Sequence, residues 1–390
     1  MKWPSVTLND LFEIARGGSP RPIDAYVTDD PGGINWIMIG DASEGSKYIT
    51  RTKKRIRKEG VQRSRMVYPG DFLLTNSMSF GKPYILQTKG CIHDGWLVLK
   101  KRKDNVDADF FYHLLGSTAV YSEFKRLAAG ATVKNLNIDL VKAVKIPLPP
   151  LDEQRRITAI LDKADLLRQK RRLALQKLDL LTNSIFFEFF GRPASNPRRL
   201  KTVRLGEIAQ FVGGGTPSRD VPAYFQGNIC WATSKDMKGE ILEGTEEHIT
   251  TEAIKHSATK LVEPGAVLVV VKSKILMHRL PVLINKVPTC FGQDLKAIVL
   301  QNGLSARYLA RHMRVDQHRL LDRARGINTE GLTLDHLREY EVLEPTGAEV
   351  RTYDLIEGRI ESERNSQMVG LELLERQFSA LEHRAFRGEL

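Results

Sequence analysis

Lysines and arginines are concentrated in one short stretch of the first half of the chain, RTKKRIRK at residues 51–58. Closely spaced cations of this kind can neutralise the phosphates of a polyanion, although the solvated edge of a strand carries the same residue types. We favour phosphate binding because so much charge is gathered in one place. The candidate ligands are Lys53, Lys54, Arg55, Arg57 and Lys58.

Two polar stretches interrupt apolar, strand-like patterns: TNSMSFGK at residues 75–82 and KSKILMHR at residues 272–279. Base edges are recognised through hydrogen-bond donors and acceptors, which these stretches supply, but ordinary hairpin loops contain the same groups. His93 and Gln293, which follow two matched cysteines, are weaker candidates. Outside the basic stretch, the predicted DNA-binding residues are Arg21, Asn76, Ser77, Ser79, Lys82, His93, Arg219, Lys235, Lys272, Lys274, His278, Arg279 and Gln293.

The positive charge is distributed unevenly along the 390 residues, which carry a formal net charge of +12. Residues 1–150 contain 23 Lys and Arg against 15 Asp and Glu, whereas residues 346–390 contain 6 against 9. A binding surface for a polyanion would produce this distribution, and so, less readily, would a basic surface with no partner.

Length and composition narrow the class of protein. The length fits two domains with connecting segments. No apolar run is long enough to span a membrane, and MKWPSVTLND at the start lacks an apolar signal region, so we expect a cytoplasmic protein. Cys91, Cys230 and Cys290 are too few and too scattered for a disulfide framework or a zinc site, and we expect no metal.

The chain contains an internal duplication. VTLNDLFEIARGGSPRP at residues 6–22 matches VRLGEIAQFVGGGTPSR at residues 203–219, with the two glycine pairs 197 positions apart. Later landmarks follow in the same order at similar offsets, including Trp36 with Trp231 and Cys91 with Cys290. Repeats of this length are whole domains rather than units of a solenoid.

Each repeat predicts a mixed α/β domain. Short helices over 8–15 and 205–211 should end at the glycine pairs, where glycine would cap the helix. Apolar runs predict strands at 71–75, 84–87, 96–100, 266–271, 281–284 and 297–300, and helices follow at 108–127 and 305–323. The fold class is therefore α/β, with two similar domains.

A long charged helix separates the two repeats. It begins after Pro149-Pro150, and residues 152–186 would span about 50 Å at 1.5 Å per residue. The end of the chain has a similar pattern, so we expect two long helices packed antiparallel as a coiled-coil spacer. The predicted parts are residues 1–150 (first domain), 151–190 (central helix), 191–345 (second domain) and 346–390 (C-terminal helix). The predicted seam residues are Ile157, Ile160, Ala164, Leu167, Ala174, Leu178, Leu181, Ile185, Ile360, Leu371, Leu374, Phe378 and Leu381.

The segments IPLPPLDEQRRITAIL and GGGTPSRDVPAYFQGNICWATSKDM, together with the duplication, resemble the specificity subunit of type I restriction–modification systems over essentially the whole chain. The resemblance implies that each domain is a target-recognition domain that reads one half of a split, asymmetric DNA sequence. It also implies that the helices set the spacing and dock two modification subunits. S-adenosylmethionine for adenine methylation, and ATP and Mg²⁺ for restriction, would be bound by modification and restriction subunits. The second repeat departs from the family pattern at LEPTGAEVRTYDLI, residues 343–356.

No catalytic set can be assembled from the sequence. An Asn/Asp-Pro-Pro-aromatic methyltransferase motif is absent, and GGGTP follows an expected helix rather than opening one, so it does not predict a cofactor loop. We therefore expect a DNA-recognition subunit that is not an enzyme. The alternatives are a coiled-coil adaptor with two protein-binding domains and an enzyme in its own right.

Overall fold

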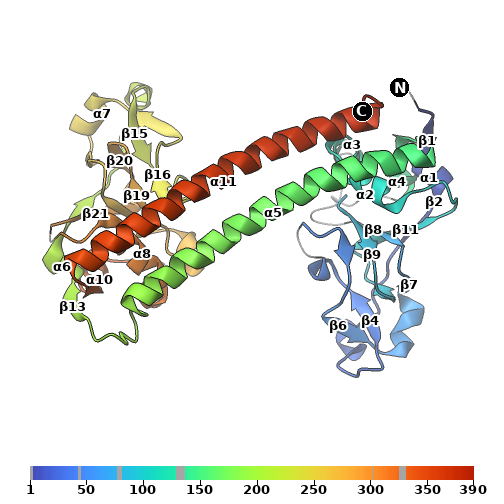
Figure 1. Cartoon of the computed structure of the whole chain (residues 1–390), viewed down its shortest axis with the longest axis horizontal. Helices are drawn as coiled ribbons and strands as arrows, with labels where there is room; N and C mark the ends of the chain where they lie inside the picture. Colours follow the sequence, from blue (N-terminus) through green and yellow to red (C-terminus); the bar gives the residue numbers. More distant parts are fainter. Residues whose placement is uncertain are drawn as a thin grey trace. The chain divides into compact units, whose positions relative to one another are not determined.

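The computed structural model describes residues 3–42, 45–76, 81–128, 136, 138–301, 303–324 and 331–390. The chain divides into two compact units, the first made of Met1–Ala174 with Gln367–Leu390 and the second of Leu175–Ser366. Each unit holds one mixed α/β domain, called here the first head and the second head, and part of each long helix (Figure 1). The predicted fold class is confirmed.

The first head is built from short strands and helices. Its strands are β1 (Ser5–Thr7), β2 (Phe12–Arg16), β3 (Val27–Thr28), β4 (Ile34–Ile37), β5 (Tyr48–Ile49), β6 (Lys54–Ile56), β7 (Arg65–Val67), β8 (Phe72–Thr75), β9 (Pro83–Leu86), β10 (Gly90–Ile92), β11 (Trp96–Lys101) and β12 (Lys145–Pro147). Its helices are α1 (Leu8–Leu11), η1 (Ile23–Ala25), η2 (Ile39–Asp41), η3 (Lys58–Arg63), α2 (Ala108–Gly116), α3 (Thr118–Ala128) and α4 (Ile138–Ala143). The strands form sheets of order β2-β11-β8-β9-β5 and β3-β6-β4-β10-β7, and β1 pairs with β12.

Alternating side chains give the first head two apolar layers. In β11, Leu97 and Leu99 belong to the core shared with α2 and the long helices, whereas Trp96 and Val98 belong to the core between the two sheets. The sheet that contains β4 and β6 therefore lies on the side of the head away from the long helices (Figure 1).

The second head repeats this plan. Its strands are β13 (Lys201–Arg204), β14 (Ala209–Gly213), β15 (Ile229–Ala232), β16 (Ile241–Leu242), β17 (Glu247–Ile249), β18 (Val267–Val270), β19 (Val282–Asn285), β20 (Thr289–Phe291), β21 (Leu295–Leu300) and β22 (Glu341–Glu344). Its helices are α6 (Leu205–Ile208), η4 (Pro222–Phe225), α7 (Thr251–Lys255), η5 (Lys274–Met277), α8 (Ala306–Val315), α9 (Gln317–Ala324) and α10 (Leu334–Arg338). The sheets are β14-β21-β18-β19-β16, β17-β15-β20 and β13-β22.

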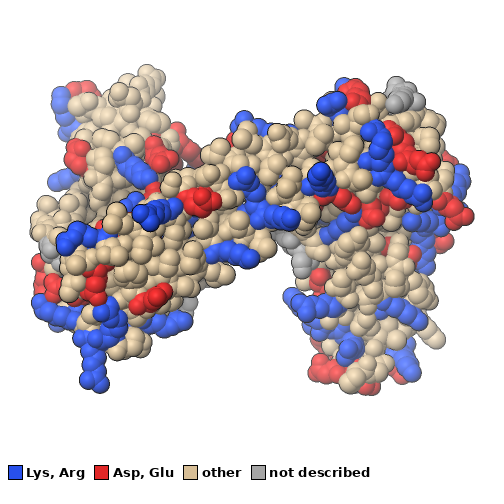
Figure 2. All heavy atoms as spheres, in the orientation of Figure 1, with Lys and Arg blue, Asp and Glu red and all other residues tan. Residues whose placement is uncertain are grey.

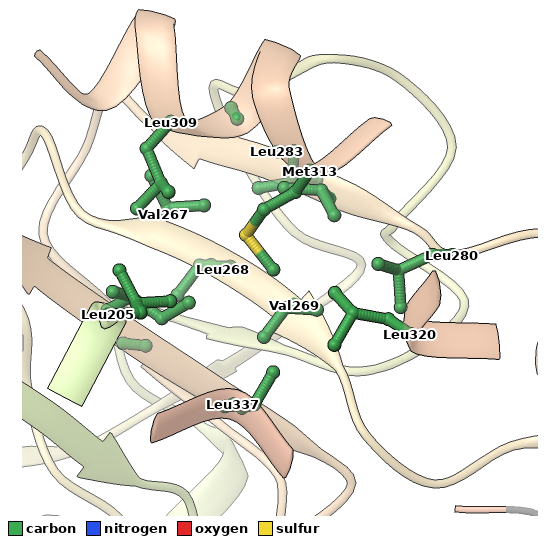
Figure 3. Close-up of a cluster of buried hydrophobic side chains, with 14 of the residues drawn as sticks. Leu205, Val267, Leu268, Val269, Leu280, Leu283, Leu309, Met313, Leu320 and Leu337 are labelled. Atoms are coloured by element: carbon green, nitrogen blue, oxygen red, sulfur yellow. The ribbon is translucent and has the colours of Figure 1, made fainter. Parts of the chain in front are cut away.

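The core of the second head forms where helices cover β18. Buried side chains of α8 (Leu309, Met313), α9 (Leu320) and α10 (Leu337) join those of β18 in one apolar cluster (Figure 3). Solid apolar strands such as β18 are buried on both faces, which explains their lack of alternation in the sequence.

Strand pairing confirms the duplication. β4 pairs antiparallel with β6 and parallel with β10, and β15 pairs in the same way with β17 and β20. Trp36 therefore lies opposite Lys54 and Cys91, just as its match Trp231 lies opposite Glu247 and Cys290 in the second head.

The glycine pairs do not cap helices, and that prediction is wrong. The helices predicted over 8–15 and 205–211 end at Leu11 and Ile208, and the chain continues as β2 and β14 up to the glycines. A Cβ on Gly17 would lie 2.0 Å from the carbonyl oxygen of His93. The close approach of a neighbouring backbone, rather than helix termination, requires glycine here.

Both long helices are present, as α5 (Leu151–Phe190) and α11 (Gly347–Arg387). Inside the first unit they run antiparallel, since Arg171 donates to Gln367 at 2.9 Å and Arg156 donates to the carbonyl of Leu390 at 2.9 Å. Inside the second unit they also run antiparallel, since Asp179 forms an ion pair with Arg364 while Phe189, further along α5, packs against Tyr353, earlier in α11. No helix in the described ranges is long and apolar enough to cross a membrane.

The predicted seam is partly wrong in register. Leu167 and Leu181 are each 46% exposed, and the neighbouring positions Arg168 and Thr182 are turned inward instead. The Arg168 guanidinium lies 4.0 Å from the ring centroid of Phe378, and the Thr182 hydroxyl donates to the Leu178 carbonyl at 2.8 Å. An apolar periodicity cannot detect polar residues that are accommodated in this way. Ile157 is buried, and the half-buried predicted residues are Ile160, Ala164, Ala174, Leu178, Ile185, Ile360, Leu371, Leu374, Phe378 and Leu381.

Candidate nucleic-acid interface

The basic stretch lies on β6 and η3 of the first head. Lys53, Lys54, Arg57 and Lys58 are exposed, and Arg55 is half-buried. Within the described part of the chain, none of these five cations forms an ion pair with an acidic side chain. Unpaired cations at this density raise the local positive potential, as phosphate binding requires. The face shown in Figure 2 carries lysine and arginine around this end of the first head, with some acidic residues beside them.

The polar stretch between β8 and β9 is only partly described. Asn76 is 1% exposed, and its amide has no hydrogen-bond partner within the described ranges, so it does not offer the base contact predicted for it. Ser77 and Ser79 lie outside the described residues. Lys82 is exposed and lines a cavity of about 260 Å³ with Tyr112 and Arg168, next to the long helices and not beside β6.

The second polar stretch joins β18 to β19, which match β8 and β9. Lys272, Lys274, His278 and Arg279 are all exposed, and Ser273 caps η5 through its hydroxyl. None of the four basic side chains has an acidic partner among the residues described. Their placement remains compatible with contacts to bases or phosphates.

His93 helps to hold the turn between β10 and β11. The backbone N–H of Gly95 lies 2.8 Å from its Nδ1, and that of Ile39 lies 3.2 Å from its Nε2. Burial lowers the pKa of His93, with Asp94 opposing the shift. The ring is therefore engaged with backbone on both sides, whereas Gln293, the candidate that follows the matched cysteine of the second head, is exposed.

The remaining candidates lie in exposed loops. Arg21 lines a cavity of about 600 Å³ with Trp36 and His93. Lys235 is exposed, and Arg219 forms a bidentate ion pair with Glu247 at 2.6 and 2.7 Å. The sequence analysis did not predict a role for Glu247, because only the strand register shows that it occupies the position of Lys54.

A charged network anchors the first head to α5, and sequence reasoning also missed it. Lys47 contacts Asp109 at 2.6 Å and Asp162 of α5 at 3.1 Å, and His113 lies 2.6 Å from Asp162. Burial alone would raise the pKa of Asp162, but hydrogen bonds from His113 and Lys47 hold it below its ordinary value.

A second charged network anchors the second head to α11. Its arginines belong to the head, and its buried glutamate Glu357 belongs to the helix. Arg311 contacts Glu357 of α11 at 2.9 Å and Glu240 at 2.7 Å, and it is 4% exposed. Burial lowers the pKa of the neighbouring Arg314 to about 10. Breaking such a buried pair by removing one partner leaves a buried charge without compensation.

His312 is a buried, neutral histidine of the second head. Its Nε2 accepts from the backbone N–H of Leu343 at 3.2 Å, and its Nδ1 lies 2.9 Å from the hydroxyl of Tyr340. Burial lowers its pKa from 6.5 to about 3, assisted by Arg319.

Acid should therefore destabilise the second unit through His312. Below its ordinary pKa the unfolded chain binds a proton that the folded chain excludes, so the stabilisation is complete above about pH 6.5 and declines by up to about 1.4 kcal/mol per pH unit as the pH falls. Urea unfolding between about pH 7 and pH 5 should show this slope. His312→Gln should reduce it, whereas the exposed control His256→Gln should keep it, and equal slopes in all three proteins would contradict the assignment.

Large apolar side chains remain exposed on both long helices. In the first unit they are Leu166, Leu167, Leu173, Met368, Val369 and Leu373. In the second unit they include Leu180 at 67% and Leu355 at 70% exposure. Large contiguous patches of exposed apolar side chains are typical of protein–protein interaction sites.

Comparison with known proteins gives a consistent result. The family model of the type I restriction modification DNA specificity domain matches residues 1–177 and 197–348. The type I restriction enzyme EcoR124I/EcoR124II specificity subunit of Escherichia coli is 39% identical over 106 residues, which are 27% of this chain and 26% of that protein. The type I restriction enzyme MjaIX specificity subunit of Methanocaldococcus jannaschii is 27% identical over 290 residues, 68% of this chain and 65% of that protein. The matches thus span less than two thirds of either relative.

Solved structures share the fold. A chain from a structure that describes complex assembly and conformational transition of the type I R-M system aligns with a TM-score of 0.58 at 18% identity, covering 100% of this chain and 98% of that one. The type I restriction-modification system S subunit from M. genitalium aligns with a TM-score of 0.57 at 15% identity, covering 99% of this chain and 96% of that one.

Proposed function

Because the chain belongs to the type I restriction modification DNA specificity domain family, we propose that it selects the DNA sequence on which a type I restriction–modification complex acts. The observation that carries the proposal is a duplicated fold whose matched positions differ in side chain, as with Lys54 and Glu247. Two heads with one fold and different surfaces fit a target made of two unlike half-sites.

In this proposal the chain binds double-stranded DNA and catalyses no reaction itself. Modification subunits would bring S-adenosylmethionine and methylate adenine, and restriction subunits would use ATP and Mg²⁺. The exposed apolar residues on α5 and α11, present in both units, support docking of one modification subunit on each unit.

The basic segment of the first head provides the test. Replacing Lys53, Lys54 and Arg55 by alanine removes cations that we assign to phosphates, so binding should weaken on every DNA sequence alike. The slope of log affinity against log salt should shrink by about 0.9 for each phosphate that is no longer neutralised. Fluorescence anisotropy with a labelled duplex, over a range of salt concentrations, measures this slope.

A matched control removes the same number of charges from cations that already have acidic partners. Lys201, Lys255 and Arg338 pair with Glu344, Glu252 and Asp335 respectively, so their replacement by alanine should leave the slope unchanged. Identical slopes for both triple variants would place residues 53–55 away from DNA. Absence of any salt-dependent DNA binding by the unmodified protein would remove the proposed function itself.

A further inference from the structure

Matched strands of the two heads carry opposite charge. Lys54 of β6 pairs in register with Trp36, and Glu247 of β17 pairs in register with Trp231. The second head therefore presents a carboxylate where the first head presents a lysine. A free carboxylate at that position would repel the phosphate backbone, so a phosphate contact like the one assigned to Lys54 is not available to Glu247.

Glu247 is occupied by Arg219. Nη1 of Arg219 donates to Oε1 of Glu247 at 2.6 Å, and Nη2 donates to Oε2 at 2.7 Å. Two parallel charge-assisted hydrogen bonds fix both the position and the plane of a guanidinium. The hydrogen bond from Arg219 holds the pKa of Glu247 below its ordinary value, which keeps the pair ionised near neutral pH.

Two aromatic rings hold the same guanidinium. Its central carbon lies 4.1 Å from the ring centroid of Phe225 and 5.3 Å from that of Trp231. The indole N–H of Trp231 donates to the Gly215 carbonyl at 3.1 Å, so the platform is itself anchored to backbone. An arginine restrained in this way loses little rotamer freedom when it binds a ligand.

The carboxylate leaves one side of the guanidinium open. Glu247 engages the end formed by Nη1 and Nη2, and within the described part of the chain nothing accepts from Nε–H. The Arg219 side chain is 55% exposed. Nε–H and the adjacent Nη–H then form two parallel donors, the arrangement that matches O6 and N7 of guanine in the major groove.

We propose that Arg219 reads a guanine in the half-site bound by the second head, with Glu247 and Phe225 as its positioning residues. This inference rests on the proposed function and goes beyond it by assigning one base to one side chain. The described part of the first head has no corresponding arginine–carboxylate pair. At the offset of 197 that aligns the glycine pairs, Pro22 occupies the position of Arg219, and Lys54 has no acidic partner in the described ranges.

The test uses the complete complex with its modification subunits, whose methylated sequence is read by single-molecule sequencing. Arg219→Lys keeps the charge and the stem but loses the bidentate face, so one guanine of one half-site should become degenerate. Discrimination at that position should fall by about tenfold to a hundredfold, with every other position unchanged. Glu247→Gln should relax the same position less, because its amide oxygen still accepts one N–H.

Glu344→Gln is the control, since it removes a carboxylate paired with Lys201 in the same head but on a different sheet. Its methylated sequence should match that of the unmodified complex. The inference is overturned if the half-site of the second head contains no guanine, or if Arg219→Lys keeps full discrimination. Equal weakening on all sequences would also overturn it, because that result identifies a phosphate contact. Methylation without any bipartite sequence would overturn the proposed function as well. A bipartite sequence that Arg219→Lys leaves unchanged would overturn only the assignment of guanine to Arg219.

Discussion

Replacing residues 203–345 with the second head of another family member should change one half of the methylated sequence and leave the other half intact. The structure favours such an exchange because β13 and β22 lie side by side, with Val203 opposite Val342. The chain therefore enters and leaves the head on neighbouring strands, and both junctions fall at one place. Methylation of the original sequence should drop by about a thousandfold or more, the usual gap between specific and non-specific binding.

The donor head must preserve the packing against the long helix. Phe186 and Phe190 of α5 pack on Tyr308, with ring centroids 5.8 and 4.9 Å apart. A donor with an aromatic residue at that position should dock on α5 without a cavity, which would otherwise cost about 3–5 kcal/mol. Sequencing of methylated sites, with the native head reinserted through the same junctions as control, measures the outcome. A new sequence in both halves would refute one half-site per head, and a palindromic target for the native protein would refute the prediction that the two half-sites differ.

Lengthening both long helices by four residues should lengthen the unread spacer of the DNA target. The insertions belong between Ala174 and Leu175 in α5 and between Ser366 and Gln367 in α11, where the two units meet in the sequence. Four residues add about 6 Å and slightly more than one helical turn, so facing residues stay close to their original phase. Since base pairs are about 3.4 Å apart, we expect the same two half-sites with one or two more base pairs between them.

The control keeps helix length constant by changing four residues at the same place to alanine. Its methylated sequence should retain the original spacer. An insertion variant that binds its modification subunits and methylates at the original spacing would show that the helices do not set the distance. Loss of the modification subunits from the insertion variant, measured by mass photometry, would instead place their docking surface across the insertion points.

The duplication and the long helices could be predicted because their signals are local or repeated. Glycine pairs, tryptophans and cysteines recur in one order. The apolar periodicity of helices of 40 and 41 residues remains recognisable even where a few positions are assigned to the wrong face. The glycine pair Gly17-Gly18 misled the prediction because glycine serves both helix ends and close backbone approach, and only the position of His93 decides between them. The seam shifted at Arg168 and Thr182 for a related reason, since polar residues do not mark a buried face in a sequence.

The candidate site was harder to predict because it depends on strand register. Arg219 was a predicted DNA ligand, but Glu247 is 28 positions away and gains its meaning only by lying opposite Trp231. Asn76 shows the reverse error, because a polar residue next to an apolar strand is buried here rather than presented to a ligand. Composition predicted a polyanion as the partner, and strand pairing was needed to decide which of the described cations already have an acidic partner.

The division of the chain into two units affects the order in which the units can fold during synthesis on the ribosome. The second unit, Leu175–Ser366, is continuous in sequence, whereas the first unit is made of two segments, Met1–Ala174 and Gln367–Leu390. Ala385 and Phe386 belong to the core of the first unit together with Phe110, so that core is completed only after the whole second unit has been synthesised. Although the first head emerges first from the ribosome, all residues of the second unit are synthesised before those of the first unit are complete. A chain that stopped after Ser366 would therefore contain the whole of the unit translated later and lack part of the core of the unit translated earlier.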